Sequence, residues 1–229
     1  MGWASYQIGN AGMFDAASLW GFFGVALLLG VTPGPDNLFV LMQSARRGWR
    51  MGLCVVLGLC LGLVVHTSAV ALGLAAVFAA SEIAFSVLKF VGAAYLLYLA
   101  WGAWSAPVQP LAMEVARAQA DAGAAGLSDA ARWLGQGVIM NLTNPKVLIF
   151  FLAFLPQFAD PGRGSVSLQI MVLGAVFIAA TLLVFGAIAC AAGTFGALLQ
   201  RSAGAQRWLG RASALIFAGL ALRLAFMEH

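Results

Sequence analysis

Long apolar runs constrain the fold of this chain more than any other feature of its sequence. Several of them reach about 20 residues, the length at which an α-helix crosses the hydrocarbon core of a bilayer. Only 9% of the 229 residues are charged and 62% are hydrophobic, whereas a soluble domain carries roughly 25% charged residues. The runs also lack the alternation of polar and apolar residues that a membrane β-barrel needs. The sequence therefore predicts an all-α integral membrane protein.

Six apolar segments are long enough to be predicted as transmembrane helices. The first and the fourth each contain an interruption that is rich in proline and polar residues, whereas the other four are continuous. The six predicted spans cover residues 17–44, 51–79, 84–104, 134–157, 168–195 and 208–227.

The interrupted spans lie at corresponding places in two halves of the chain. Aligning Pro35 with Pro145 places Asp36 opposite Lys146. Because each half contains an odd number of spans, the halves are expected to be inverted repeats. Paired interruptions in inverted halves are typical of a transporter binding site near the bilayer midplane. We accordingly expect an N-terminal tail (1–16), a first three-helix repeat (17–104), a cytoplasmic connecting loop (105–133) and a second three-helix repeat (134–229).

Most of the 12 Lys and Arg residues lie in three of the connections between spans. Cytoplasmic connections of membrane proteins are enriched in Lys and Arg, so we expect these three connections inside the cell and both termini outside. The net charge of +4 then reflects membrane orientation, and no nucleic-acid partner is expected. The arginines concerned are Arg46, Arg47, Arg50, Arg117, Arg132, Arg201, Arg207 and Arg211.

The sequence GVTPGPDNLF, at residues 30–39, interrupts the first span. Proline has no amide N–H and clashes with the carbonyl four residues before it, so Pro33 and Pro35 should unwind about one turn. Carbonyls freed in this way are costly in lipid, so the interruption should face protein or a wet cavity. The helix that resumes after Pro35 presents free N–H groups, which favour a carboxylate. That carboxylate could be Asp36, capping its own helix without any ligand, or one on a substrate.

Two charged side chains, Asp36 and Lys146, lie within the interrupted spans. An ionised side chain at mid-bilayer costs on the order of 3 kcal/mol on insertion scales. We therefore expect the two to lie near each other, either paired or sharing a water-filled cavity. Asn37, Asn141 and Asn144 add hydrogen-bonding groups beside the two interruptions.

The second span contains two further features. His66 lies near its middle, and it is either a neutral histidine bonded to a neighbouring helix or a proton-coupling or substrate contact, since imidazole titrates near physiological pH. Gly58 and Gly62 form a small-xxx-small surface, which allows close helix contact within the chain or across a homodimer.

Three blocks of sequence resemble the LysE/RhtB family of amino-acid exporters, or LysE-type translocators. TPGPDNLFVLMQSARRGWRMGL, LKFVGAAYLLYLAWGAW and NLTNPKVLIFFLAFLPQF are similar to the family's signatures in the first, third and fourth helices. The resemblance implies a secondary transporter of the bacterial inner membrane that exports amino acids or close derivatives, driven by the proton motive force. The motif positions that it covers are Thr32, Pro33, Gly34, Pro35, Asn144, Pro145 and Lys146.

A site for an amino-acid zwitterion needs one anionic and one cationic partner. Asp36 could meet the substrate ammonium, and Lys146 or the helix start after Pro145 could meet the carboxylate. Alternating access would rock one half against the other around this site, with Asp36 and His66 as candidates for proton coupling. The residues expected to bind substrate are Thr32, Gly34, Asp36, Asn37, Asn141, Asn144 and Lys146, and the helix-breaking residues are Pro33, Pro35 and Pro145.

Other classes of function explain fewer of these features. A membrane-embedded enzyme would need a nucleophile–base pair or a metal cluster, and the sequence has no H-E-x-x-H motif and two histidines in all. A cation or metal-ion transporter, the main alternative, would need several intramembrane carboxylates, of which Asp36 is the clear example. A structural protein would give the broken helices no purpose. We therefore expect no catalytic activity, no cofactor and no bound metal.

Overall fold

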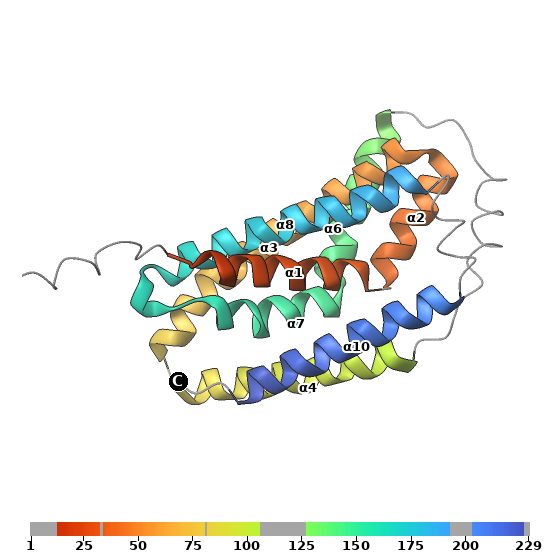
Figure 1. The fold of residues 1–229 in the computed structure, drawn as a ribbon. Helices are drawn as coiled ribbons and strands as arrows, with labels where there is room; N and C mark the ends of the chain where they lie inside the picture. Colours follow the sequence, from red (N-terminus) through yellow and green to blue (C-terminus); the bar gives the residue numbers. More distant parts are fainter. Residues whose placement is uncertain (1–12, 33, 81, 106–126, 193–202, 227–229) are drawn as a thin grey trace, which may run out of the picture.

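The computed structural model describes residues 13–32, 34–80, 82–105, 127–192 and 203–226, and it contains helices but no strand within these ranges. The prediction of an all-α protein is confirmed (Figure 1). The α-helices are α1 (Ala16–Val31), α2 (Pro35–Arg47), α3 (Trp49–Ala80), α4 (Glu82–Ser105), α6 (Leu127–Thr143), α7 (Pro145–Ala153), α8 (Val166–Ala191) and α10 (Ala203–Ala225), with short 3-10 helices η1 (Leu155–Phe158) and η2 (Pro161–Arg163).

Two helices, α3 and α8, are long and apolar enough to cross a bilayer. The number rises to four if each of two bent helix pairs forms one span. The bend between α1 and α2 measures 63°, and the bend between α6 and α7 measures 56°. Both predicted interruptions are thus sharp bends. In α4 and α10 the apolar segments are shorter, at Phe90–Ser105 and Gly210–Leu222, so the count of six spans stays a prediction.

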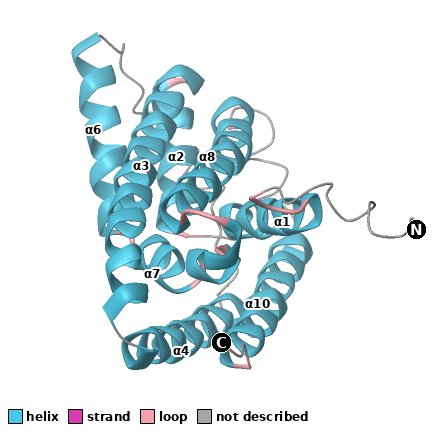
Figure 2. Ribbon diagram, turned by 90° about the vertical axis from the view of Figure 1, so that its left-hand side faces the viewer, coloured by secondary structure: helices cyan, strands magenta, loops and turns pink. Residues whose placement is uncertain are grey.

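Helices of the two halves pack against each other in corresponding pairs. Helix α3 packs along α6, and α1 packs along α8. The two contacts are equivalent, because α1 corresponds to α6 in the other half of the chain and α3 corresponds to α8. Helix α3 also packs along α8, and α4 along α10, and both pairs lie side by side in Figures 1 and 2. This pairing is what a repeat would produce, while the inverted repeat itself stays a prediction.

The arginine-rich connection after the first bent pair is much tighter than predicted. Helix α2 continues to Arg47 and α3 begins at Trp49, with Gly48 alone between them. Gly48 has a φ of 86°, a left-handed conformation that glycine adopts without a steric penalty. The two helices therefore meet at a single-residue turn, with Arg46, Arg47 and Arg50 around it.

Helix α6 begins at Leu127, inside the segment predicted as a loop at 105–133. Tertiary contacts explain the earlier start, because this first turn docks against α2. Arg47 Nη1 lies 3.4 Å from Asp129 Oδ2, and the Arg47 guanidinium lies 5.8 Å from the centre of the Trp133 ring. The remainder of that loop (106–126), most of the N-terminal tail (1–12) and Pro33 lie outside the described residues.

The buried apolar residues form two clusters, one on each side of the bends. The larger cluster is rich in phenylalanine and joins α1, α7 and α8 with parts of α3, α4 and α10. The smaller one joins α2, α3 and α8. The larger includes Phe22, Phe150, Phe151, Phe154 and Phe177, and the smaller includes Val40, Val55, Leu59 and Phe185. The space between the two clusters is the level at which both bent pairs break.

Glycines allow α3 and α6 to approach closely. A Cβ atom on Gly58 would overlap the Leu134 carbonyl oxygen, and one on Gly62 would lie 2.6 Å from Asn141 Oδ1. Both glycines of the predicted small-residue surface therefore face the inside of the chain.

Candidate functional site

The carbonyl end of α1 is satisfied by side chains from beyond the break. The residue four positions after Leu29 is Pro33, which has no N–H, so the Leu29 carbonyl has no partner within its own helix. Lys146 Nζ donates to the Leu29 oxygen at 3.2 Å and to the Thr32 oxygen at 3.4 Å. Asn37 Nδ2 donates to the Gly30 oxygen at 2.6 Å. The Lys146 ammonium thus lies at the negative end of the α1 dipole, where a cation is favoured.

Asp36 is the second residue of α2 and is buried, with 5% of its surface exposed. Its Oδ2 atom accepts a hydrogen bond of 2.6 Å from Asn144 Nδ2. Its Oδ1 atom is buried and has no hydrogen-bond partner among the described residues. The bond that Asp36 makes therefore goes to the second half of the chain, and one carboxylate oxygen is left for another donor.

Asn144 links the starts of α2 and α7. Its Oδ1 atom accepts from the Lys146 backbone N–H at 3.0 Å and so caps α7, while its Nδ2 atom donates to Asp36. Among the ion pairs formed by described residues, none joins Asp36 directly to Lys146. Their expected proximity instead takes the form of a shared pocket, with Asn144 as the bridge.

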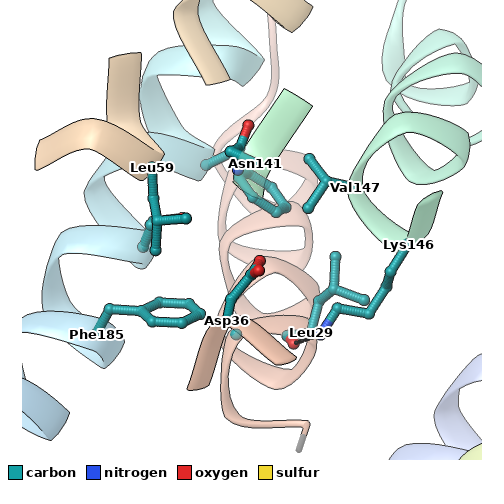
Figure 3. A pocket seen from close by; sticks show the side chains of 10 residues that line it. Leu29, Asp36, Leu59, Asn141, Lys146, Val147 and Phe185 are labelled. Carbon is teal, nitrogen blue, oxygen red and sulfur yellow. Dashed lines mark hydrogen bonds between the residues drawn. The ribbon is translucent and has the colours of Figure 1, made fainter. Parts of the chain in front are cut away.

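This pocket lies where six helices meet (Figure 3). Asp36 and Lys146 approach it from different sides, and Asn141 lies across it from Asp36. The space inside it is about 20 Å³, roughly enough for one water molecule, so the pocket is narrow in this structure. The lining residues are Leu29, Gly30, Asp36, Leu59, Asn141, Lys146, Val147, Phe177, Thr181 and Phe185.

His66 does not line the pocket itself but contacts Asn141, which does. Its Nε2 atom lies 3.3 Å from the Asn141 carbonyl oxygen, and its ring contacts Phe151. Asn141 is 2% exposed, and its Oδ1 atom has no hydrogen-bond partner within the described part of the chain. A role for His66 in proton coupling stays a prediction.

The other predicted site residues contribute mainly through the backbone. The Thr32 hydroxyl donates to the Leu28 oxygen at 2.7 Å, and its carbonyl accepts from Lys146. A Cβ atom on Gly34 would lie 3.3 Å from Lys146 Nζ, so the missing side chain leaves room for the ammonium. Pro35 and Pro145 each occupy the first position of a helix, where a proline loses no hydrogen bond.

Sequence reasoning missed the wall that α8 contributes. Phe177, Thr181 and Phe185 follow one another at intervals of four residues, so they share one face of the helix. Thr181 is a polar residue within an apolar run, and it could have been found because His66 was singled out by the same signal. The two phenylalanines look like any other core residue in the sequence.

The fold and the site together define a helical membrane protein with a pocket, lined by one acidic and one basic side chain, between two broken helices. Within the described ranges, no three His, Cys, Asp or Glu side chains lie together as a metal site would require. The chain belongs to the LysE type translocator family, whose family model matches residues 22–228. The resemblance seen in the sequence is confirmed.

Several relatives cover most of the chain. An uncharacterised membrane protein of Pseudomonas aeruginosa is 33% identical over 88% of this chain and 91% of its own length. A homoserine/homoserine lactone efflux protein of Salmonella typhi is 32% identical over 69% of this chain and 71% of its own. A leucine efflux protein of an Enterobacter strain is 26% identical over 94% of this chain and 98% of its own length. No solved structure matches the chain.

Proposed function

We propose that this protein is a secondary transporter that exports amino acids or close derivatives across the bacterial inner membrane. The observation that carries the proposal is one carboxylate and one ammonium, of Asp36 and Lys146, lining the same small pocket. An amino-acid zwitterion has the complementary pair of charges. Relatives named as efflux proteins for homoserine, its lactone and leucine support the same class of substrate.

The two charged side chains each keep bonding capacity for a substrate. Asp36 Oδ1 has no donor among the described residues and can accept from the substrate ammonium. An ammonium carries three N–H donors, and Lys146 uses two of them on the carbonyls of Leu29 and Thr32. The third can meet the substrate carboxylate.

The same contacts offer a route from proton binding to movement. Asn144 and Lys146, both of the second half, hold Asp36 and the end of α1, both of the first half. Protonation of Asp36 would replace a charge-assisted hydrogen bond from Asn144 by a weaker neutral one. The proton motive force could thus loosen one half from the other and support alternating access around the pocket. His66, bonded to Asn141, is the second candidate for this coupling.

The proposal is tested by counterflow in proteoliposomes, with and without a pH gradient. The labelled substrates are lysine, arginine, threonine, homoserine, leucine and cysteine. We expect a subset to be transported, and Asp36→Asn and Lys146→Met to lower the rate roughly 30-fold or more, because truncating one partner of a buried charged contact costs about 2–5 kcal/mol. Asp160→Asn, which removes an exposed carboxylate paired with Arg163, is the matched control and should leave the rate unchanged.

Folded protein that moves no amino acid would contradict the proposal, and the same vesicles would then be loaded with divalent cations to test a cation transporter. If Asp36→Asn retains transport that a pH gradient drives, Asp36 is not the coupling group. His66→Gln, which can still bond to the Asn141 carbonyl, would then test the second candidate.

A further inference from the structure

The wall of the pocket beyond its two charged residues is mostly apolar. Asp36 and Lys146 are the charged residues among those that line it, and their formal charges cancel. A bound zwitterion would use both of them through its ammonium and carboxylate. The substrate side chain would then meet an uncharged surface formed by Leu29, Leu59, Val147, Phe177 and Phe185.

Asn141 and Thr181 are the two uncharged polar residues in this wall. Thr181 lies between Phe177 and Phe185 on α8 and is 5% exposed. A threonine hydroxyl in an apolar helix ordinarily donates to the carbonyl four residues before it. Thr32, Thr67 and Thr143 do so, at 2.7, 2.7 and 2.8 Å.

The Thr181 hydroxyl makes no such bond, nor any other to a residue that the structure describes. It borders the pocket, so a ligand or water in the pocket is the partner open to it.

We propose that the pocket selects uncharged amino acids and that the Thr181 hydroxyl favours a hydroxyl-bearing side chain over an aliphatic one of the same size. The proposal rests on the proposed function, since it names the substrate class of that same site. A second cation, as in lysine or arginine, would face the apolar wall without an acidic partner, which is unfavourable. A second carboxylate would have to compete for Lys146.

Homoserine and norvaline form a matched pair of probes, because norvaline has a methyl group where homoserine has a hydroxyl. In proteoliposomes, wild-type protein should transport labelled homoserine with the higher kcat/KM. Thr181→Val, which has nearly the same shape without the hydroxyl, should lower the homoserine-to-norvaline ratio about tenfold, the effect of one lost hydrogen bond. Thr181→Ser should keep the preference, and Thr181→Ala should lose it if the valine variant does not fold.

Thr67→Val is the control, because Thr67 is also buried but does not line the pocket. The homoserine-to-norvaline ratio of this variant should equal that of the wild type. An unchanged ratio in Thr181→Val, or a wild type that prefers norvaline, would overturn the role of Thr181. Transport of lysine or arginine as efficient as that of homoserine would overturn the selection of uncharged substrates. In each of these cases amino-acid export itself stands, whereas a wild type that moves no amino acid contradicts the proposed function.

Discussion

At the scale of single residues, Asn144 has a task that few other side chains could perform. A helix cap needs an acceptor for a free backbone N–H, and serine, threonine, aspartate and asparagine all supply one. The contact with Asp36 also needs an N–H donor on the same side chain. A carboxamide is the short group that offers an acceptor oxygen and a donor nitrogen together, which accounts for asparagine at this position.

This pairing predicts a rescue by exchange. Asn144→Asp keeps the cap on α7 but brings a second carboxylate against Asp36, so it should destabilise the fold by about 1–3 kcal/mol, the cost of leaving a buried polar group without its partner. Adding Asp36→Asn restores the hydrogen bond in the opposite direction, because the amide at position 36 can donate to the carboxylate at position 144. The double variant should therefore be more stable than Asn144→Asp alone, as measured by the free energy of unfolding in detergent.

Asp160→Asn, combined with Asn144→Asp, removes a carboxylate far from the pocket and should restore nothing. If that variant gains as much stability as the exchange does, or if the exchange gains none, the contact between positions 36 and 144 does not hold the two halves together.

At the scale of helices, the sequence predicts those features of the fold that depend on residues close together in the chain. Pro33 and Pro35 interrupt any helix that would run through them, so the position of the first bend follows from the order of the residues alone. The partner of the freed Leu29 carbonyl does not, because Lys146 reaches it from 117 positions along the chain. The fourth span was predicted to begin at 134, with at most a short separate helix near Ser128 or Asp129, whereas α6 runs unbroken from Leu127. Its first turn is held by Arg47 of another helix, a contact between distant residues.

The contact between α3 and α6 yields a prediction about glycine. Gly58→Ala would push a methyl group against the Leu134 backbone carbonyl, which cannot rotate away. We expect a loss of about 1–3 kcal/mol, the usual cost of overpacking, seen as a lower melting temperature in detergent. Gly73→Ala, on the same helix with nothing within 4 Å of the added atom, should be neutral or slightly stabilising because alanine favours helix. Equal effects of the two substitutions would contradict the close packing.

At the scale of the whole molecule, the ion pairs between described residues gather at two ends, away from the pocket. Arg47 pairs with Asp129 at one end, and Arg163 pairs with Asp15 and Asp160 at the other. The Ser18 amide and hydroxyl donate to Asp15, and these bonds, with Arg163 nearby, hold the pKa of the Asp15 carboxyl below its usual value. The two ends are where a membrane protein of this shape would meet water.

The distribution of arginines predicts which end faces the cytoplasm, and labelling of single cysteines can test it. Cys54, Cys60 and Cys190 are first replaced by alanine, and then Ala131→Cys or Gly162→Cys is introduced, both at exposed positions. Because positive loops stay inside, a membrane-impermeant maleimide should label position 162 in intact cells and position 131 only after permeabilisation. The reverse pattern would invert the orientation, and with it the direction in which an inward proton gradient could drive export.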